Sequence, residues 1–491
     1  MNYSDVQGLV RFGYSRLTEA SFLLLKIRNA SAARAWLVTA PVGTAVELDQ
    51  APRTALQVAF TGPGLQALGV TDRVLAGFSA EFLAGMAEES RSRRLGDVGA
   101  NSPQYWRWGG SGRVPHVLVM LYAQPNQLAE WTQTIKGTDW DAAFEVLDCL
   151  PTSNLAGVEP FGFPDGISQP TPDWKRQRVL HGDQLGYGNM VALGEFLLGY
   201  PNEYGKYTDR PLLNAGELAS SVLPFAEDVP DKRDLARNGT YLIFRQLQQD
   251  VRGFWRYLDQ QTGSNPEARQ ELAESMVGRR MNGDPMVPLR AQPIGGINKQ
   301  SAAQNQFTYD SDSDGTGCPF GAHIRRTNPR NADLPAGSKG LFARLFHTLG
   351  FGSKKYRDDV LASTRFHRLL RRGREYGPGL SPEQAIADSP DTDEHGIHFI
   401  CMAANISRQF EFVQNAWLMS TKFDAMTEES DPLLGNRQSV PGCPFTNTFS
   451  RPQTTGVRNR IMDVPQFVRV RGGAYFFLPS LSALRYLAGL S

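Results

Sequence analysis

This sequence has few cysteines, no long apolar run and no excess of charge of either sign. Its four cysteines, Cys149, Cys318, Cys401 and Cys443, lie far apart and form no CxxC pair, so neither a disulfide framework nor a cysteine-rich zinc site is expected. Lysine and arginine number 51 against 50 aspartate and glutamate, which leaves a net charge of +1. This balance argues against nucleic acid and against an anionic membrane as partners.

The start of the chain also lacks the features of a signal peptide. It carries no basic stretch, and its longest early apolar run, residues 22–25, is far too short for a signal core or a membrane span. We therefore expect a cytoplasmic protein that does not enter a membrane. An export signal removed upstream of Met1 is the alternative.

Length and apolar patterning predict two domains of mixed helix and sheet. A chain of 491 residues is longer than one hydrophobic core usually serves. Residues 247–258 and 406–417 place their apolar side chains on one face of a helix, and 30–37 does so more weakly. Segments typical of buried strands occur in both halves of the chain: 21–28, 55–60, 117–122, 241–244, 398–402 and 474–478.

The order of these segments favours an antiparallel sheet with helices packed on it. We expect an α+β fold of two ferredoxin-like domains, of the dimeric α+β barrel type. The polar, proline-containing segment 225–232 is a suitable linker. The expected domains are therefore 1–225, which contains the GFPDG segment, and 226–491.

Three segments rich in glycine or proline each present one side chain suited to chemistry. Asp165 lies in GFPDG, His323 in GCPFGAHIRRTNPR and Arg371 in LRRG. Each allows an ordinary interpretation, namely a turn aspartate that caps its own backbone, a loop histidine and a solvated arginine. The functional interpretation is a pocket carboxylate acting as acid or base, a metal ligand held by a rigid loop, and an inward arginine that requires an anion.

Neighbouring basic residues strengthen the functional interpretation of His323. Arg325, Arg326 and Arg330 follow it closely, and guanidinium groups suit carboxylates such as the propionates of haem. Strand alternation places Arg371 and Arg372 on opposite faces, so that one of them can point inward. The other histidines are interpreted as structural: His116, His181, His347, His367, His395 and His398.

An acidic run, 310–315, matches the opening of a calcium-binding loop. Its twelfth position is Gly321 instead of glutamate, so a standard EF-hand is rejected. An acidic turn is the favoured interpretation, and a weaker cation site is the alternative.

Taken in this order, the three segments resemble motifs of the dye-decolorizing peroxidase family, in particular its longer-chain subfamilies. GFPDG is similar to the family's GxxDG motif, CPFGAHIRRTNPR to its proximal-histidine segment, and RLLRRGREYG to its distal-arginine strand. The similarity extends over nearly the whole chain and includes VRGGAYFF near the end.

The resemblance implies one haem b per chain, bound between the sheet and the helices of the C-terminal domain. His323 would be the proximal iron ligand, and Asp165 and Arg371 would be the distal catalytic pair. Either Asp431 or Glu411 would accept a hydrogen bond from His323, and the sequence does not choose between them. The further cofactor-binding residues implied are Gly166, Ile167, Ser168, Arg325, Asn328, Arg330, Ile397 and Phe399.

The implied activity is that of a peroxidase, in which hydrogen peroxide is the oxidant and bulky aromatic compounds give up single electrons. Asp165 as the base predicts an acidic activity optimum, because an aspartate stays ionised where a histidine is already protonated. A haem-binding or haem-handling protein without significant turnover is the alternative, and it would need neither Asp165 nor Arg371. A structural protein stabilised by a cation at 310–314 is a third class. A homo-oligomer is left open.

Overall fold

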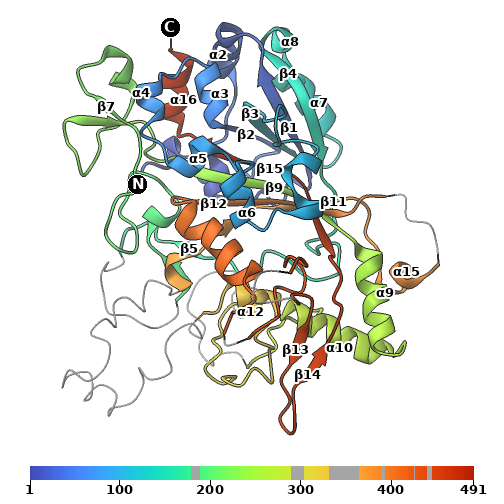
Figure 1. Cartoon of the computed structure of the whole chain (residues 1–491). Helices are drawn as coiled ribbons and strands as arrows, with labels where there is room; N and C mark the ends of the chain where they lie inside the picture. The colour runs from blue at the N-terminus through green and yellow to red at the C-terminus, as the bar shows by residue number, and fades with distance from the viewer. Residues whose placement is uncertain are drawn as a thin grey trace, which may run out of the picture.

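The protein is built on one bent antiparallel sheet (Figure 1). The computed structural model describes residues 1–177, 188–288, 304–330, 364–388, 393–424, 426–439 and 445–490, so His181, His347 and Cys443 lie outside the described residues. Within these ranges the sheet has nine strands in the order β10-β12-β9-β15-β2-β3-β1-β4, with β11 paired to β12. Their bounds are β1 Glu19–Ile27, β2 Thr54–Phe60, β3 Val117–Ala123, β4 Phe144–Pro151, β9 Thr240–Gln249, β10 Leu370–Arg371, β11 Arg374–Tyr376, β12 Gly396–Ala403 and β15 Val468–Leu478.

Strands of both halves of the chain meet in this sheet. Phe477 of β15 pairs with Phe60 of β2. The sheet bends so that the ring centroids of Phe22 on β1 and Phe244 on β9 lie 5.6 Å apart in a shared core. The α+β fold with an antiparallel sheet is thereby confirmed. Among the described residues the sheet is open, because β10 and β4 are the two ends of the strand order.

The expected boundary between residues 225 and 226 falls between two short paired strands, β7 (Leu212–Asn214) and β8 (Lys232–Asp234). Because both halves contribute to one sheet and one shared core, the division into domains 1–225 and 226–491 stays a prediction.

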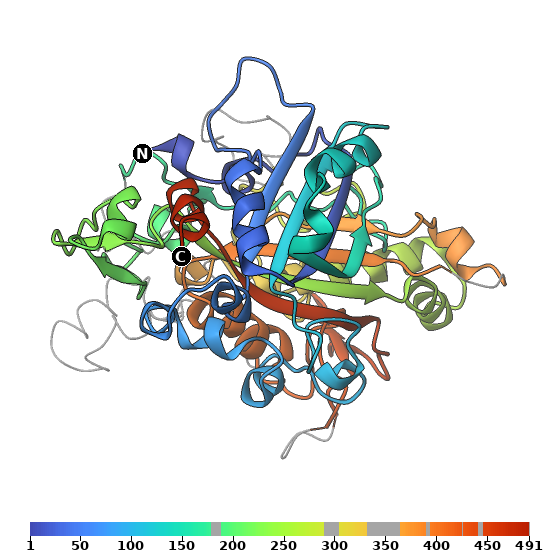
Figure 2. The same ribbon diagram turned by 90° about the horizontal axis from the view of Figure 1, so that it is seen from above.

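Helices cover the sheet on two sides. In Figure 1, α2 (Ala30–Thr39), α3 (Gly62–Ala67) and α16 (Leu481–Ala488) lie above it, and Figure 2 shows the red α16 beside the blue N-terminal helices. Below it lie α9 (Val251–Gln261), α10 (Pro266–Val277) and α12 (His323–Thr327). Two helical segments with π-type turns, η9 (Ser407–Glu411) and η10 (Val413–Met419), occupy the predicted helix 406–417. None of the helices described is both long enough and apolar enough to cross a bilayer.

The expectation of a helix from residue 247 is wrong at its start. Strand β9 continues to Gln249, and α9 begins at Val251. The side chain of Asp250 accepts a hydrogen bond from the N–H of Gly253, which caps the helix. Leu247 therefore belongs to the alternating pattern of the strand instead of the helical face.

Alternation along the strands creates two different faces at the C-terminal half of the sheet. On β12, Ile397 and Phe399 line a cavity, whereas His398 between them points into the shared core beside Phe22 and Phe244. The prediction that His398 faces away from Ile397 and Phe399 is confirmed. The cavity face is where the candidate site lies.

Candidate active site

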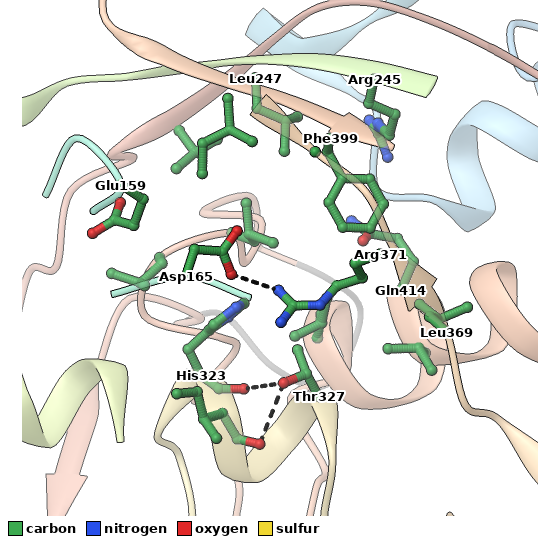
Figure 3. Close-up of a pocket in the computed structure, with 18 of the residues that line it drawn as sticks. Glu159, Asp165, Arg245, Leu247, His323, Thr327, Leu369, Arg371, Phe399 and Gln414 are labelled. Atoms are coloured by element: carbon green, nitrogen blue, oxygen red, sulfur yellow. Dashed lines mark hydrogen bonds and ion pairs between the residues drawn. The ribbon is translucent and has the colours of Figure 1, made fainter. Parts of the chain in front are cut away.

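The candidate active site is a cavity between the lower face of the sheet and the helices α12 and η10 (Figure 3). Its floor and walls are mainly apolar, with a small number of charged groups pointing inward, which is the usual character of a ligand-binding cavity. Apolar lining side chains come from strands, helices and a turn that are distant in sequence: Leu247, Val277, Phe399, Phe410, Leu433 and Val470.

Asp165 and Arg371 form an ion pair inside this cavity. Arg371 Nη1 donates to Asp165 Oδ1 at 3.0 Å, although the residues are 206 positions apart. The N–H of Gly166 donates to the same oxygen at 2.6 Å, and Gly166 has φ of +80°, a conformation that favours glycine. The turn places the carboxylate of Asp165 at the cavity, so its location agrees with both interpretations, and its role as acid or base stays a prediction.

The surroundings favour the ionised form of Asp165. Burial alone would raise the pKa of this carboxyl, but the Arg371 guanidinium, the Gly166 N–H and the nearby His323 together lower it. Arg371 is held in turn through its backbone, because its N–H donates to Gln169 Oε1 at 3.0 Å. The pair is thus a fixed carboxylate beside a fixed cation.

His323 lies across the cavity from this pair, at the start of α12 (Figure 3). Its Nδ1 lies 3.0 Å from Asp431 Oδ2, which leaves Nε2 as the nitrogen available to a ligand in the cavity. Asp431 is fully buried, and its Oδ1 accepts hydrogen bonds from the N–H groups of Leu433 and Leu434 at 2.9 and 2.8 Å. Burial opposes the charge of Asp431, but His323 and the N–H of Leu434 outweigh it and lower its pKa.

The structure therefore distinguishes between the two acids that the sequence left open. Glu411 is equally buried, but Arg91 Nη1 donates to it at 2.8 Å and the Tyr475 hydroxyl donates to it at 3.0 Å. Phe410, which precedes Glu411 in the sequence, and Gln414, three residues after it, line the cavity, whereas Glu411 does not. The expectation that Glu411 contacts His323 is corrected: its position on the helical turn points it away from the cavity.

Arg325 also points away from the cavity. Its guanidinium binds Asp312 Oδ2 at 2.8 Å and the carbonyl of Cys318 at 2.7 Å. The reason is helical geometry, since Arg325 lies about 200° around the axis from His323 at 100° per residue, whereas Thr327 returns to the cavity side. The expectation that Arg325 binds the cofactor is corrected. Asp312 thus lies in an acidic turn, which agrees with the favoured interpretation of 310–315. Its carboxylate binds Arg325.

Arg330, the other expected partner of a propionate, lies next to the cavity but does not line it. Its Nη1 donates to the carbonyls of Asn305 and Phe307 at 3.0 and 2.9 Å. The remaining residues expected to bind the cofactor all line the cavity: Gly166, Ile167, Ser168, Asn328, Ile397 and Phe399.

Further polar residues to which the sequence analysis gave no role in the site also line the cavity, among them Glu159, Arg279, His367 and Arg368. Arg279 is buried and donates to the hydroxyl of Ser168 at 2.8 Å. His367 stacks on Phe412 with ring centroids 3.8 Å apart. Its Nδ1 lies 2.5 Å from the carbonyl of Arg408, so these contacts agree with the structural interpretation of His367 although the residue also lines the cavity.

Glu159 has an unusual environment for a carboxylate. Burial raises its pKa to about 7, and the charge of Asp165 adds to the rise. Three hydrogen-bond donors oppose that rise, namely the side chain of Gln249 and the N–H groups of Phe163 and Phe161. Glu159 and Asp165 are thus two carboxyl groups of one cavity whose surroundings shift their pKa values in opposite directions.

This arrangement can bind an atom at His323, hold a proton acceptor and a cation on the opposite side, and exclude bulk water with apolar walls. A general base needs a free oxygen within reach of the proton that it takes. Both the Arg371 and the Gly166 hydrogen bonds go to Asp165 Oδ1, which leaves Oδ2 for that task. The site is therefore suited to the cleavage of a small polar molecule between His323 and Asp165.

Comparison with known proteins identifies close architectural relatives. No protein-family model matches the chain. It is 28% identical over 511 residues to a dye-decolorizing peroxidase, msp1, of Mycetinis scorodonius, covering 99% of this chain and 87% of the relative. Among solved structures, a dye-decolorizing peroxidase in complex with 2,6-dimethoxyphenol matches with a TM-score of 0.73 at 25% identity over 100% of both chains. A fungal DyP-type peroxidase from Auricularia auricula-judae matches with a TM-score of 0.72 at 26% identity, over 100% of this chain and 99% of the other.

Proposed function

We propose that this chain is a member of the dye-decolorizing peroxidase family, whose members it resembles over its whole length, and that it uses hydrogen peroxide to oxidise bulky aromatic donors by one-electron steps. The observation that carries the proposal is the convergence of Asp165, Arg371 and His323 on one cavity. One structural relative contains 2,6-dimethoxyphenol, which supports phenols and dyes as the class of donor.

We further propose that the cavity holds one haem b. The donor set fits such a group, because His323 presents Nε2 while Asp431 holds Nδ1, and the apolar walls suit a macrocycle. Arg279, Arg368 and Asn328 line the cavity and suit its carboxylates. When bound, the haem supplies an iron that stores the oxidising equivalents of peroxide and passes them on as single electrons. Asp431 would make His323 a stronger ligand by accepting a hydrogen bond from its Nδ1–H group.

Asp165 and Arg371 would carry the proton and charge movements of the peroxide step. Asp165 Oδ2 would accept a proton from the peroxide oxygen nearer His323 and return it to the other oxygen, which would leave as water, with the two electrons supplied by the bound haem. Arg371 stabilises the negative charge that develops while the O–O bond breaks. Because Arg371 helps to keep the pKa of Asp165 low, the base stays ionised in acid, which supports an acidic optimum.

The alternative of a haem-handling protein without turnover would require His323 but not the ion pair opposite it. An arginine and an aspartate fixed at 3.0 Å in a cavity have no use in simple haem storage, since neither would need to act on a bound oxidant. The ion pair therefore favours the peroxidase.

The test is the visible spectrum of the haem-loaded protein before and after one equivalent of hydrogen peroxide. The proposal expects a Soret band that shifts with peroxide and returns when an aromatic donor is added. Asp165→Asn should bind haem normally but react with peroxide at least a hundredfold more slowly, and His323→Ala should lose the normal ferric spectrum. A wild-type Soret band that peroxide does not move would leave a haem-handling protein.

A further inference from the structure

Glu159 holds the main chain of the turn that carries Asp165. Its Oε2 accepts a hydrogen bond from the N–H of Phe161 at 3.0 Å, and its Oε1 accepts one from the N–H of Phe163, also at 3.0 Å. The backbone of Glu159 closes the same turn, because its N–H donates to the carbonyl of Phe163 at 2.8 Å and its carbonyl accepts from Gly162. One side chain thus binds two amides that lie two and four residues further along the chain.

The same carboxylate joins the turn to the sheet. Gln249, the last residue of β9, donates from Nε2 to Glu159 Oε2 at 2.7 Å. On the other side of the turn, Val158 and Pro164 form a β-bridge, and the N–H of Asp165 donates to the carbonyl of Gly157 at 3.0 Å. Movement of the turn away from β9 would therefore require the hydrogen bond between Gln249 and Glu159 to break.

We propose that Glu159 is a positioning residue for the peroxide step: its carboxylate braces the turn 157–166 against β9 and so keeps Asp165 in contact with Arg371. The proposal rests on the proposed function of Asp165 as the base. A catalytic base displaced by about 1 Å loses much of its effect, because proton transfer needs a short, aligned path. Burying a carboxylate is costly unless its oxygens receive hydrogen bonds. Both oxygens of Glu159 receive them, from two amides of the turn that carries Asp165 and from Gln249 of β9.

A second carboxylate provides a matched control. Glu375 of β11 is also half-buried, and burial together with the charge of Asp165 raises its pKa. It therefore resembles Glu159 in charge and in its proximity to Asp165. It differs in what it holds, because the carboxylate of Glu159 binds the amides of the turn, whereas Glu375 contributes its backbone carbonyl to Ser153.

The first measurement is hydrogen exchange of the turn in the haem-free protein, which does not depend on catalysis. Glu159→Gln replaces one accepting oxygen by an NH₂ group that faces an N–H donor, so one amide of the turn loses its acceptor. We expect exchange of one of the two amides, Phe161 or Phe163, to rise roughly tenfold or more in this variant. Glu375→Gln should leave both amides as protected as in the wild type. Unchanged protection in Glu159→Gln would overturn the brace.

The second measurement is the rate constant for hydrogen peroxide in the haem-loaded enzyme, together with KM for an aromatic donor. Glu159→Gln should lower the peroxide rate constant, followed on the haem absorbance, at least tenfold and leave KM for the donor unchanged. Partial unfolding would reduce the amplitude of that signal instead of its rate constant. Equal losses in Glu159→Gln and Glu375→Gln would show a charge effect on Asp165 and overturn positioning. If Glu159→Gln does not fold, Gln249→Ala removes only the link to β9 and should give a two- to fivefold loss. A wild-type rate there would also contradict the proposal.

Asp165→Asn, measured alongside, separates this proposal from the function on which it rests. If Asp165→Asn reacts with peroxide as fast as the wild type, the proposed base is wrong and the role of Glu159 in the peroxide step is wrong with it. If Asp165→Asn is slow but Glu159→Gln is not, the base stands and only the positioning role is refuted.

Discussion

Replacing Arg371 by leucine is expected to move the acid limb of the peroxide reaction to higher pH. In the wild type, Arg371 is the largest influence that offsets burial and lowers the pKa of Asp165. In the proposed mechanism the ionised carboxylate is the active base, so the rate should be retained in acid and lost only as the pH falls through this low pKa. Without the cation, the pKa of Asp165 rises, and the rate must be lost at a higher pH.

The size of the shift follows from the geometry of the pair. The joined atoms are 3.0 Å apart, and the side chains of Arg371 and Asp165 are 32% and 33% exposed. Unit charges about 4 Å apart attract by about 1 kcal/mol in water and by about 4 kcal/mol at an effective dielectric constant of 20. Partial exposure favours the lower part of this range, and about 1.4 kcal/mol corresponds to one pH unit. We therefore expect the midpoint of the acid limb to rise by about one unit.

The assay is stopped-flow measurement of the peroxide rate constant from pH 2.5 to 8. Arg371→Lys is the control, because it keeps the charge while changing the hydrogen-bond geometry; its midpoint should stay within about 0.3 unit of the wild type, although its maximal rate falls. A midpoint in Arg371→Leu that is unchanged or lower would refute the electrostatic argument. A wild-type rate that rises continuously to pH 8 would refute Asp165 as the base.

Three further variants test the proximal side of the site and the corrected residues. Asp431→Asn should raise the reduction potential of the bound iron by about 60 mV or more, because His323 loses a charged acceptor worth at least ~1.4 kcal/mol; spectroelectrochemistry that finds an unchanged potential would contradict this. Glu411→Gln should leave the potential within about 15 mV of the wild type but lower the free energy of unfolding by about 1–3 kcal/mol, as measured by denaturant titration. Arg325→Met should destabilise the fold by about 3–5 kcal/mol, because the buried carboxylate of Asp312 loses its cation; destabilisation below 1 kcal/mol would show that this ion pair is unimportant.

The sequence was sufficient for the local parts of the site. GFPDG predicts a tight turn, and both Gly162 and Gly166 have positive φ, which is why a short motif could identify Asp165 without knowledge of the rest of the chain. Alternation on β12 predicted that Ile397 and Phe399 share a face opposite to His398, because strand periodicity is local. The mixed helix and sheet content could be predicted for the same reason.

The residues at which helices and strands begin and end were less predictable. The apolar pattern of residues 247–258 fits a helix, but pairing with β12 and β15 keeps Leu247 in strand β9. Those hydrogen bonds join residues far apart in sequence and outweigh a local helical preference. The bend that brings the two halves of the sheet over one core is likewise a property of the assembled strands.

By itself, the sequence determined which side chains to propose for the chemistry: Asp165, His323 and Arg371 each stand in a motif whose glycines and prolines constrain the nearby backbone. Only the tertiary structure decided which groups they meet. Asp431 reaches His323 from 108 residues away. The equally buried Glu411 points away from the cavity and binds Arg91 and Tyr475 instead. The physical reason is that side-chain direction depends on the rotation of each element about its own axis, and packing against the sheet sets that rotation.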